Sequence, residues 1–122
     1  MEKYLISAEN NLIKIVLNDE AIIDDKDYFL IQHEVRKINK NKNLPLLVIS
    51  GIGTSSTERA NEFMMNEDDS SRFIIAIVIK NLANRINASH YKKITKETKT
   101  VEIFSNESEA RKWLATFQNE TF

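Results

Sequence analysis

The chain has 122 residues, a formal net charge of −1, 42% hydrophobic and 29% charged residues, and no cysteine. This length and composition are typical of one folded domain with its own hydrophobic core. The near-zero charge argues against a general attraction to nucleic acid or to anionic membranes. The missing cysteines exclude disulfides, thiol catalysis and thiolate metal sites.

The first residues of the chain and its few glycine and proline residues indicate how many domains it has. Met1–Tyr4 lead directly into a strand-like pattern, without the basic and apolar regions of a signal peptide. No window has the length of a membrane helix. The chain has two glycines, one proline and no repeat or linker, so nothing marks a domain boundary. We expect a single domain over residues 1–122, located in the cytoplasm.

Two strand-like segments open the chain. Residues 4–8 and 12–17 are rich in apolar side chains and are separated by the short stretch 9–11. In the second segment apolar residues alternate with a mixed set, as expected near the edge of a sheet. These segments predict an antiparallel hairpin.

A helix and a strand are predicted next. Asp24 can cap the helix, and acidic residues follow in the first turn, where the helix dipole favours negative charge. An apolar stripe at helical spacing continues it: Tyr28, Ile31, Val35 and Ile38. Residues 44–50 then predict a short apolar strand, and Gly51 and Gly53 provide the turn after it.

The segment 54–65 predicts a shorter helix. Ser55, followed three residues later by Glu58, is a capping-box pattern. Ala60, Phe63 and Met64 supply an inward stripe. The polar, acidic stretch Asn66–Ser71 predicts a loop before the next strand.

Residues 73–79 form a run of seven apolar residues, Phe-Ile-Ile-Ala-Ile-Val-Ile. A strand with one face in water would alternate apolar and polar residues, so this run predicts a strand buried on both faces. Burial on both faces requires helices above and below the sheet. The run therefore indicates a layered α/β domain.

Two helices and one more strand complete the prediction. Asn81 can cap a helix that contains Leu82 and Ile86, and residues 100–104 predict the last strand. Ser105 or Asn106 can cap the final helix. The buried stripe of that helix is Ala110, Trp113, Leu114 and Phe117. The order is β-β-α-β-α-β-α-β-α, which predicts a mixed, mostly parallel sheet with an N-terminal hairpin and about four helices.

No catalytic constellation accompanies these elements, so we expect no enzyme activity, no catalytic residues and no cofactor. The acidic residues Asp24, Asp25 and Asp27 lack the spacing of a calcium loop and are better explained by dipole compensation, so no metal site is predicted. His33 and His90 fall on different helices, without a nucleophile motif. The basic residues of 90–99 predict a solvated helix end, so no nucleic-acid partner is expected.

The chain carries a resemblance to a known family. Val101–Phe104 resembles the "v-x-i-F" final strand of STAS-like domains, and Glu109–Leu114 resembles the "E-A-x-x-W-L" helix that follows it. The strand 46–49, a turn and then "T-E-x-A" at 57–60 are similar as well. The chain thus resembles the STAS-like, or SpoIIAA-like, domains related to bacterial anti-sigma-factor antagonists.

This resemblance implies a non-enzymatic regulatory or scaffolding domain that binds a protein partner. Partner-switching members carry a phosphorylatable serine after the third strand, where this chain has Ser55, Ser56 and Thr57. A phosphate there would meet the free amides of a helix N-terminus. The aspartate and glycine that flank the family's serine are missing, and helix capping by Ser55 or Ser56 is the favoured alternative.

The resemblance also implies a second function. Relatives in the wider STAS-like and SEC14-like fold group are associated with lipids or apolar molecules. Binding of a small apolar ligand predicts a cavity between the sheet and the helices bearing Met64 and Ile86.

A homodimer, formed through a helix face or the exposed edge of the hairpin, is also expected.

Overall fold

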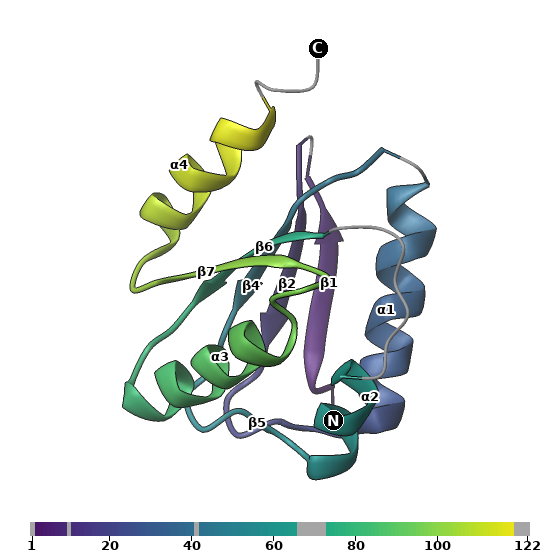
Figure 1. The fold of residues 1–122 in the computed structure, drawn as a ribbon, viewed down its shortest axis with the longest axis vertical. Helices are drawn as coiled ribbons and strands as arrows, with labels where there is room; N and C mark the ends of the chain where they lie inside the picture. The colour runs from purple at the N-terminus through teal and green to yellow at the C-terminus, as the bar shows by residue number, and fades with distance from the viewer. Residues whose placement is uncertain (1, 10, 41, 66–72, 119–122) are drawn as a thin grey trace.

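The computed structural model describes residues 2–9, 11–40, 42–65 and 73–118, so the predicted loop Asn66–Ser71 lies outside the described residues. The elements are shown in Figure 1. In chain order they are β1 (Tyr4–Ala8), β2 (Ile13–Leu17), β3 (Ile22–Ile23), α1 (Asp25–Asn39), β4 (Leu46–Ile49), β5 (Ser55–Ser56), α2 (Glu58–Met65), β6 (Ile74–Val78), α3 (Leu82–Ile94), β7 (Thr100–Phe104) and α4 (Glu107–Gln118).

The main sheet has the strand order β1-β2-β4-β6-β7. β1 and β2 pair antiparallel, and every other pair in this sheet is parallel. The predicted α/β class, the hairpin and the parallel crossovers are therefore confirmed. β3 and β5 form a small parallel sheet that was not predicted, because two-residue strands are too short to show a periodicity.

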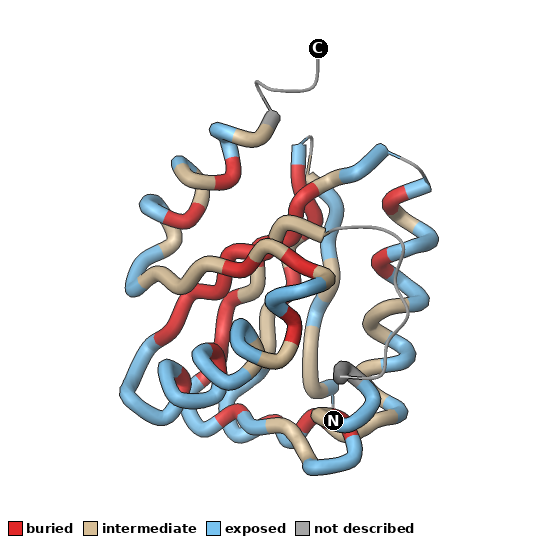
Figure 2. The backbone as a smooth tube through the Cα atoms, in the orientation of Figure 1, coloured by how far each residue is buried: buried red, intermediate tan, exposed pale blue. Residues whose placement is uncertain are grey.

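β6 lies between β4 and β7 and is buried on both faces, as predicted. Ile75 and Ile77 join the cluster that contains Val35 of α1 and Ala88 of α3. Their neighbours in β6 join the cluster of α4 with Ala110 and Leu114. Because successive side chains of a strand point to opposite faces, α1 and α3 cover one face of the sheet and α4 covers the other. Figure 2 shows this buried central sheet.

Three of the four helix starts agree with the predictions. Asp24 caps α1 in a capping box with Asp27, and Asn81 and Asn106 accept hydrogen bonds from the backbone N–H three residues later. The prediction for α2 is wrong. Ser55 and Ser56 lie in β5, and the Oγ1 of Thr57 accepts the hydrogen bond from Ala60 N at 3.1 Å. Pairing of β5 with β3 holds the two serines extended, which moves the cap to the next residue.

The inner face of α3 is made of residues that the sequence did not single out. Leu82 and Ile86 are 72% and 61% exposed. Asn84 and Ala88, on the opposite side of the helix, are buried. The rotation of α3 is fixed by two asparagine amides, since Asn84 Nδ2 donates to Gly51 O and Asn87 Nδ2 to Thr54 O, each at 3.0 Å.

α4 is held by packing and by charge. Trp113 contacts Phe104 and Phe117, with ring centroids 5.7 and 4.8 Å away. Arg111 donates to Glu107 at 2.7 Å and to Glu9 of the hairpin turn at 2.9 Å. The hydrogen bonds from Arg111 lower the pKa of Glu9 and that of Glu107.

No helix in the described part of the chain is long and apolar enough to cross a membrane.

Replacing this arginine should give a pH-dependent loss of stability. Arg111→Met should lower the free energy of unfolding at neutral pH by about 1 kcal/mol, a modest effect because these side chains are more than a third exposed and screened by water. The lowered folded-state pKa values mean that the stabilisation is present above the unfolded value of about 4.3 and is lost as the pH falls through the folded values. Urea unfolding between neutral pH and about pH 3 measures this.

Lys112→Met is the matched control, because Lys112 is on the same helix and its side chain is 74% exposed. The two variants should differ at neutral pH and converge in acid. A difference between them that stays constant over the whole pH range would contradict the assignment.

Candidate functional site

A cavity of about 190 Å³ lies on the face of the sheet that α1 and α3 cover. Its floor is made of side chains from the three central strands, which are Ile15 and Leu17 of β2, Leu46 and Val48 of β4, and Ile75 and Ile77 of β6. These positions alternate along each strand and therefore share one face. These six floor residues are all aliphatic.

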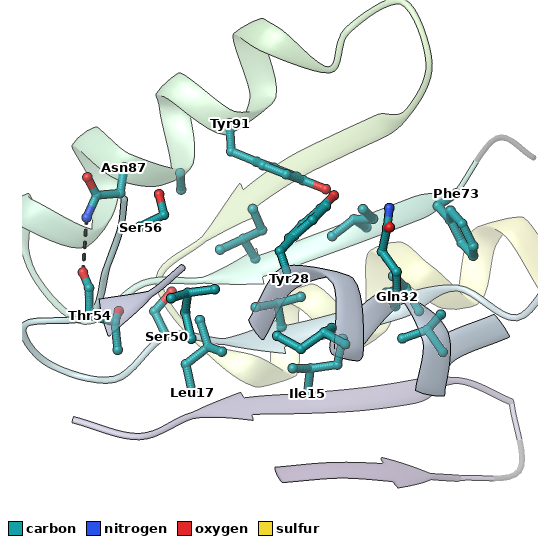
Figure 3. A pocket seen from close by; sticks show the side chains of 18 of the residues that line it. Ile15, Leu17, Tyr28, Gln32, Ser50, Thr54, Ser56, Phe73, Asn87 and Tyr91 are labelled. Carbon is teal, nitrogen blue, oxygen red and sulfur yellow. Dashed lines mark hydrogen bonds between the residues drawn. The ribbon is translucent and has the colours of Figure 1, made fainter. Parts of the chain in front are cut away.

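The walls of the cavity come from the two helices. α1 contributes Tyr28, Ile31 and Val35, and α3 contributes Ala88 and Tyr91. α2 packs against both helices, so it bridges the separation between them. In Figure 3 the rings of Tyr28 and Tyr91 extend toward each other from the two walls. Ala88 is the smallest of the α3 side chains that line the cavity.

One end of the cavity is formed by polar groups at the carboxyl end of β4. Thr54 and Asn87 line this end and are joined by a hydrogen bond (Figure 3). The carbonyl of Gly51 accepts bonds from Thr54 Oγ1 and Asn84 Nδ2, both at 3.0 Å. Glycine is required at position 51, since a Cβ there would lie 2.5 Å from the carbonyl oxygen of Leu17. The turn after β4 is therefore fixed tightly against β2 and α3.

The predicted switch residues lie beside this end of the cavity. Ser55 is exposed and Ser56 is half-buried, and both line the cavity. Ser56 Oγ donates to Asn61 Oδ1 at 2.9 Å, and Thr57 caps α2. Two of the three residues, Ser55 and Ser56, therefore border the cavity, and Thr57 is the cap of the adjacent helix. Of the three, Ser55 has the most accessible side chain.

The cavity predicted from the resemblance is present. The helix bearing Ile86, α3, forms one wall as predicted, whereas the wall formed by α1 was not predicted. Ile86 points to solvent and does not line the cavity. The side chain of Met64 lies outside what the structure describes. α1 and α3 form the walls. The hydrogen bonds donated by the side-chain amides of Asn84 and Asn87 turn the side of α3 opposite Ile86 toward the sheet.

Several polar cavity residues were not predicted. Ser50 continues the alternation of Leu46 and Val48, and Gln32 lies within the apolar stripe of α1. Lys99, which was assigned to a solvated helix end, is 5% exposed and lines the cavity. In each case the available signal was a polar residue at a position where the periodicity predicts burial. Such a residue identifies a site only when a cavity lies beside it.

The acidic residues and the two histidines considered in the sequence analysis are not among the described residues that line the cavity. Asp24 and Asp27 form the capping box of α1, and Asp19 Oδ1 accepts a hydrogen bond from Ile52 N at 2.9 Å. Within the described ranges no group of three His, Cys, Asp or Glu side chains is arranged to hold a metal ion. His33 and His90 are exposed, on α1 and α3.

Comparison with known proteins identifies a solved structure with the same fold and a family to which the chain belongs. A crystal structure of a DUF3478-family protein from Shewanella loihica PV-4, described as having a SpoIIAA-like fold, is similar with a TM-score of 0.60. The identity is 12%, and the match covers 91% of each chain, so the chain has a SpoIIAA-like fold. No curated protein matches the sequence significantly. Residues 6–118 match the domain of unknown function DUF7793, and the chain therefore belongs to the DUF7793 family.

Proposed function

We propose that this domain is a non-enzymatic binding module that holds a small, mainly apolar molecule in the cavity between the sheet and helices α1 and α3. The observation that supports this function is the cavity itself, about 190 Å³ in volume with an aliphatic floor. A cavity of about 150 Å³ with a similar lining is sufficient to bind benzene. The space is therefore large enough for a ring or a short chain.

The energetics also favour an occupant. Protein interiors are packed as densely as organic crystals, and voids larger than a water molecule are few. Apolar side chains that line an unfilled space make fewer packing contacts than those in a filled core. A ligand that fills the space restores those contacts, and its binding free energy includes this gain.

Two buried alanines on opposite sides of the sheet test whether the space is available in solution. Ala88 lines the cavity, whereas Ala76 packs with Leu47 and Leu114 beneath α4. Ala88→Leu should leave the free energy of unfolding unchanged or raise it, because the added side chain enters the cavity. Ala76→Leu should lower it by about 1–3 kcal/mol through overpacking. Urea unfolding of both variants measures this, and an equal loss in the two would contradict an open cavity.

Binding can be tested directly with toluene. Titration into ¹⁵N-labelled protein should shift the amide resonances of residues that line the cavity, including Val48, Ile77 and Tyr91. Ala88→Leu should weaken this binding by filling the space. Ala83→Leu is the control, because Ala83 is exposed on the same helix. If toluene causes no shifts at these residues, the function proposed above is wrong.

A protein partner is the second candidate function, as the resemblance implied. The observation that favours it is the outer face of α3, where Leu82 and Ile86 lie one turn apart and are largely exposed. Large exposed aliphatic side chains often mark interaction surfaces. Phosphate on Ser55, at the adjacent edge of the cavity, would add negative charge that a partner could recognise. The homodimer expected from the sequence also remains a prediction.

A variant that introduces negative charge tests this surface. A partner recovered by affinity purification from the source organism should be lost with the double variant Leu82→Glu and Ile86→Glu and retained with Ser89→Glu, an exposed residue of the same helix. Equal recovery with all forms would contradict docking on α3. Phosphopeptide mass spectrometry of the purified protein tests the switch, and phosphate on none of Ser55, Ser56 and Thr57 would contradict it.

A further inference from the structure

Ser50 places a hydroxyl group on the floor of the cavity. It follows Ile49 at the carboxyl end of β4 and shares a face with Leu46 and Val48. The residue is 7% exposed. Figure 3 shows its side chain among those that line the cavity, toward the Thr54 end. A polar group therefore lies at a buried position of an otherwise aliphatic floor.

The hydroxyl of Ser50 makes no hydrogen bond within the part of the chain that the structure describes, although its backbone N–H donates to Val78 O at 2.9 Å. The polar side chains around it differ in this respect. Thr54 Oγ1 donates to Gly51 O, Asn87 Nδ2 to Thr54 O and Ser56 Oγ to Asn61 Oδ1. Ser50 is thus a buried residue at this end whose hydroxyl has donor and acceptor capacity to spare.

The Ser50 oxygen is not sealed inside the protein, because among the described residues the fully buried side-chain atom without a partner is Glu9 Oε2. A hydroxyl that faces a cavity without a protein partner is free to bind a water or a ligand. Here the hydroxyl faces a cavity with space for more than one water. A ligand group that hydrogen-bonds to Ser50 would satisfy it. The alternative, a single bound water, makes a different prediction for ligand preference.

The surroundings of Ser50 define the shape and charge of this ligand. Leu46 and Ser50 both line the cavity and are four residues apart, so the floor extends about 13 Å along β4 at about 3.3 Å per residue. Lys99 and Arg36, which also line the cavity, are already engaged in interactions of their own. Two basic side chains therefore border the same space as the Ser50 hydroxyl.

We propose that the cavity binds an elongated, mainly apolar molecule that carries a hydroxyl or carbonyl group hydrogen-bonded to Ser50. This inference rests on the function proposed above and specifies the chemical class of the ligand. Ser50 gives the site a preferred orientation, with the polar group of the ligand at the carboxyl end of β4 and the apolar body over Val48 and Leu46.

The test compares toluene with p-cresol, which differ by one hydroxyl group, on the full chain. Dissociation constants are measured by NMR titration for the native protein, Ser50→Ala and Ser7→Ala, the last a control on the exposed edge strand β1. The ratio of the two constants should shift against p-cresol by about 2- to 10-fold in Ser50→Ala, the range for one hydrogen bond, and should be unchanged in Ser7→Ala.

Ser50→Cys is a second variant of nearly the same size, and its weakly hydrogen-bonding thiol should shift the ratio in the same direction. An unchanged ratio in both Ser50 variants, with toluene still bound, would overturn the role of Ser50 while leaving the binding of apolar molecules intact. This is the result expected if Ser50 holds only a water. If neither probe binds, both the role of Ser50 and the proposed function fail.

Discussion

The side chains of β6 leave the strand alternately toward two separate hydrophobic clusters, and the rest of the structure depends on this two-sided burial. A strand without a polar face must have apolar cover above and below, so α4 packs on one side and α1 and α3 on the other. The neighbouring strand β4 is covered in the same way. The hairpin β1-β2 completes one side of the sheet, and β7 forms the other edge.

The two faces are covered differently. On one face a single helix, α4, packs with Leu114 and Ala110 directly against β6. On the other face α1 and α3 are bridged by α2, and the small side chain of Ala88 lines the cavity. Both faces carry a hydrophobic cluster, and the cluster on the second face includes residues of the cavity floor such as Ile15 and Ile77. The middle of the second face remains available for binding.

The sequence predicted those features that local patterns determine. The uninterrupted run at β6 predicted its two-sided burial, and short-range capping patterns predicted the starts of α1, α3 and α4. The rotation of α3 could not be predicted in this way. It depends on hydrogen bonds from Asn84 and Asn87 to backbone carbonyls 33 residues away, and these override the apolar character of Leu82 and Ile86. The cavity could be expected from family resemblance, but its walls depend on that rotation.

The bonds that converge on the Gly51 carbonyl have a consequence for local dynamics. Thr54 donates to this oxygen through both its backbone N–H and its hydroxyl, and Asn84 of α3 donates to it as well. The short turn therefore opens only together with the first half of α3, as one cooperative unit. In hydrogen–deuterium exchange, the amide of Thr54 would show the slow exchange of a helix interior rather than the fast exchange of a surface turn.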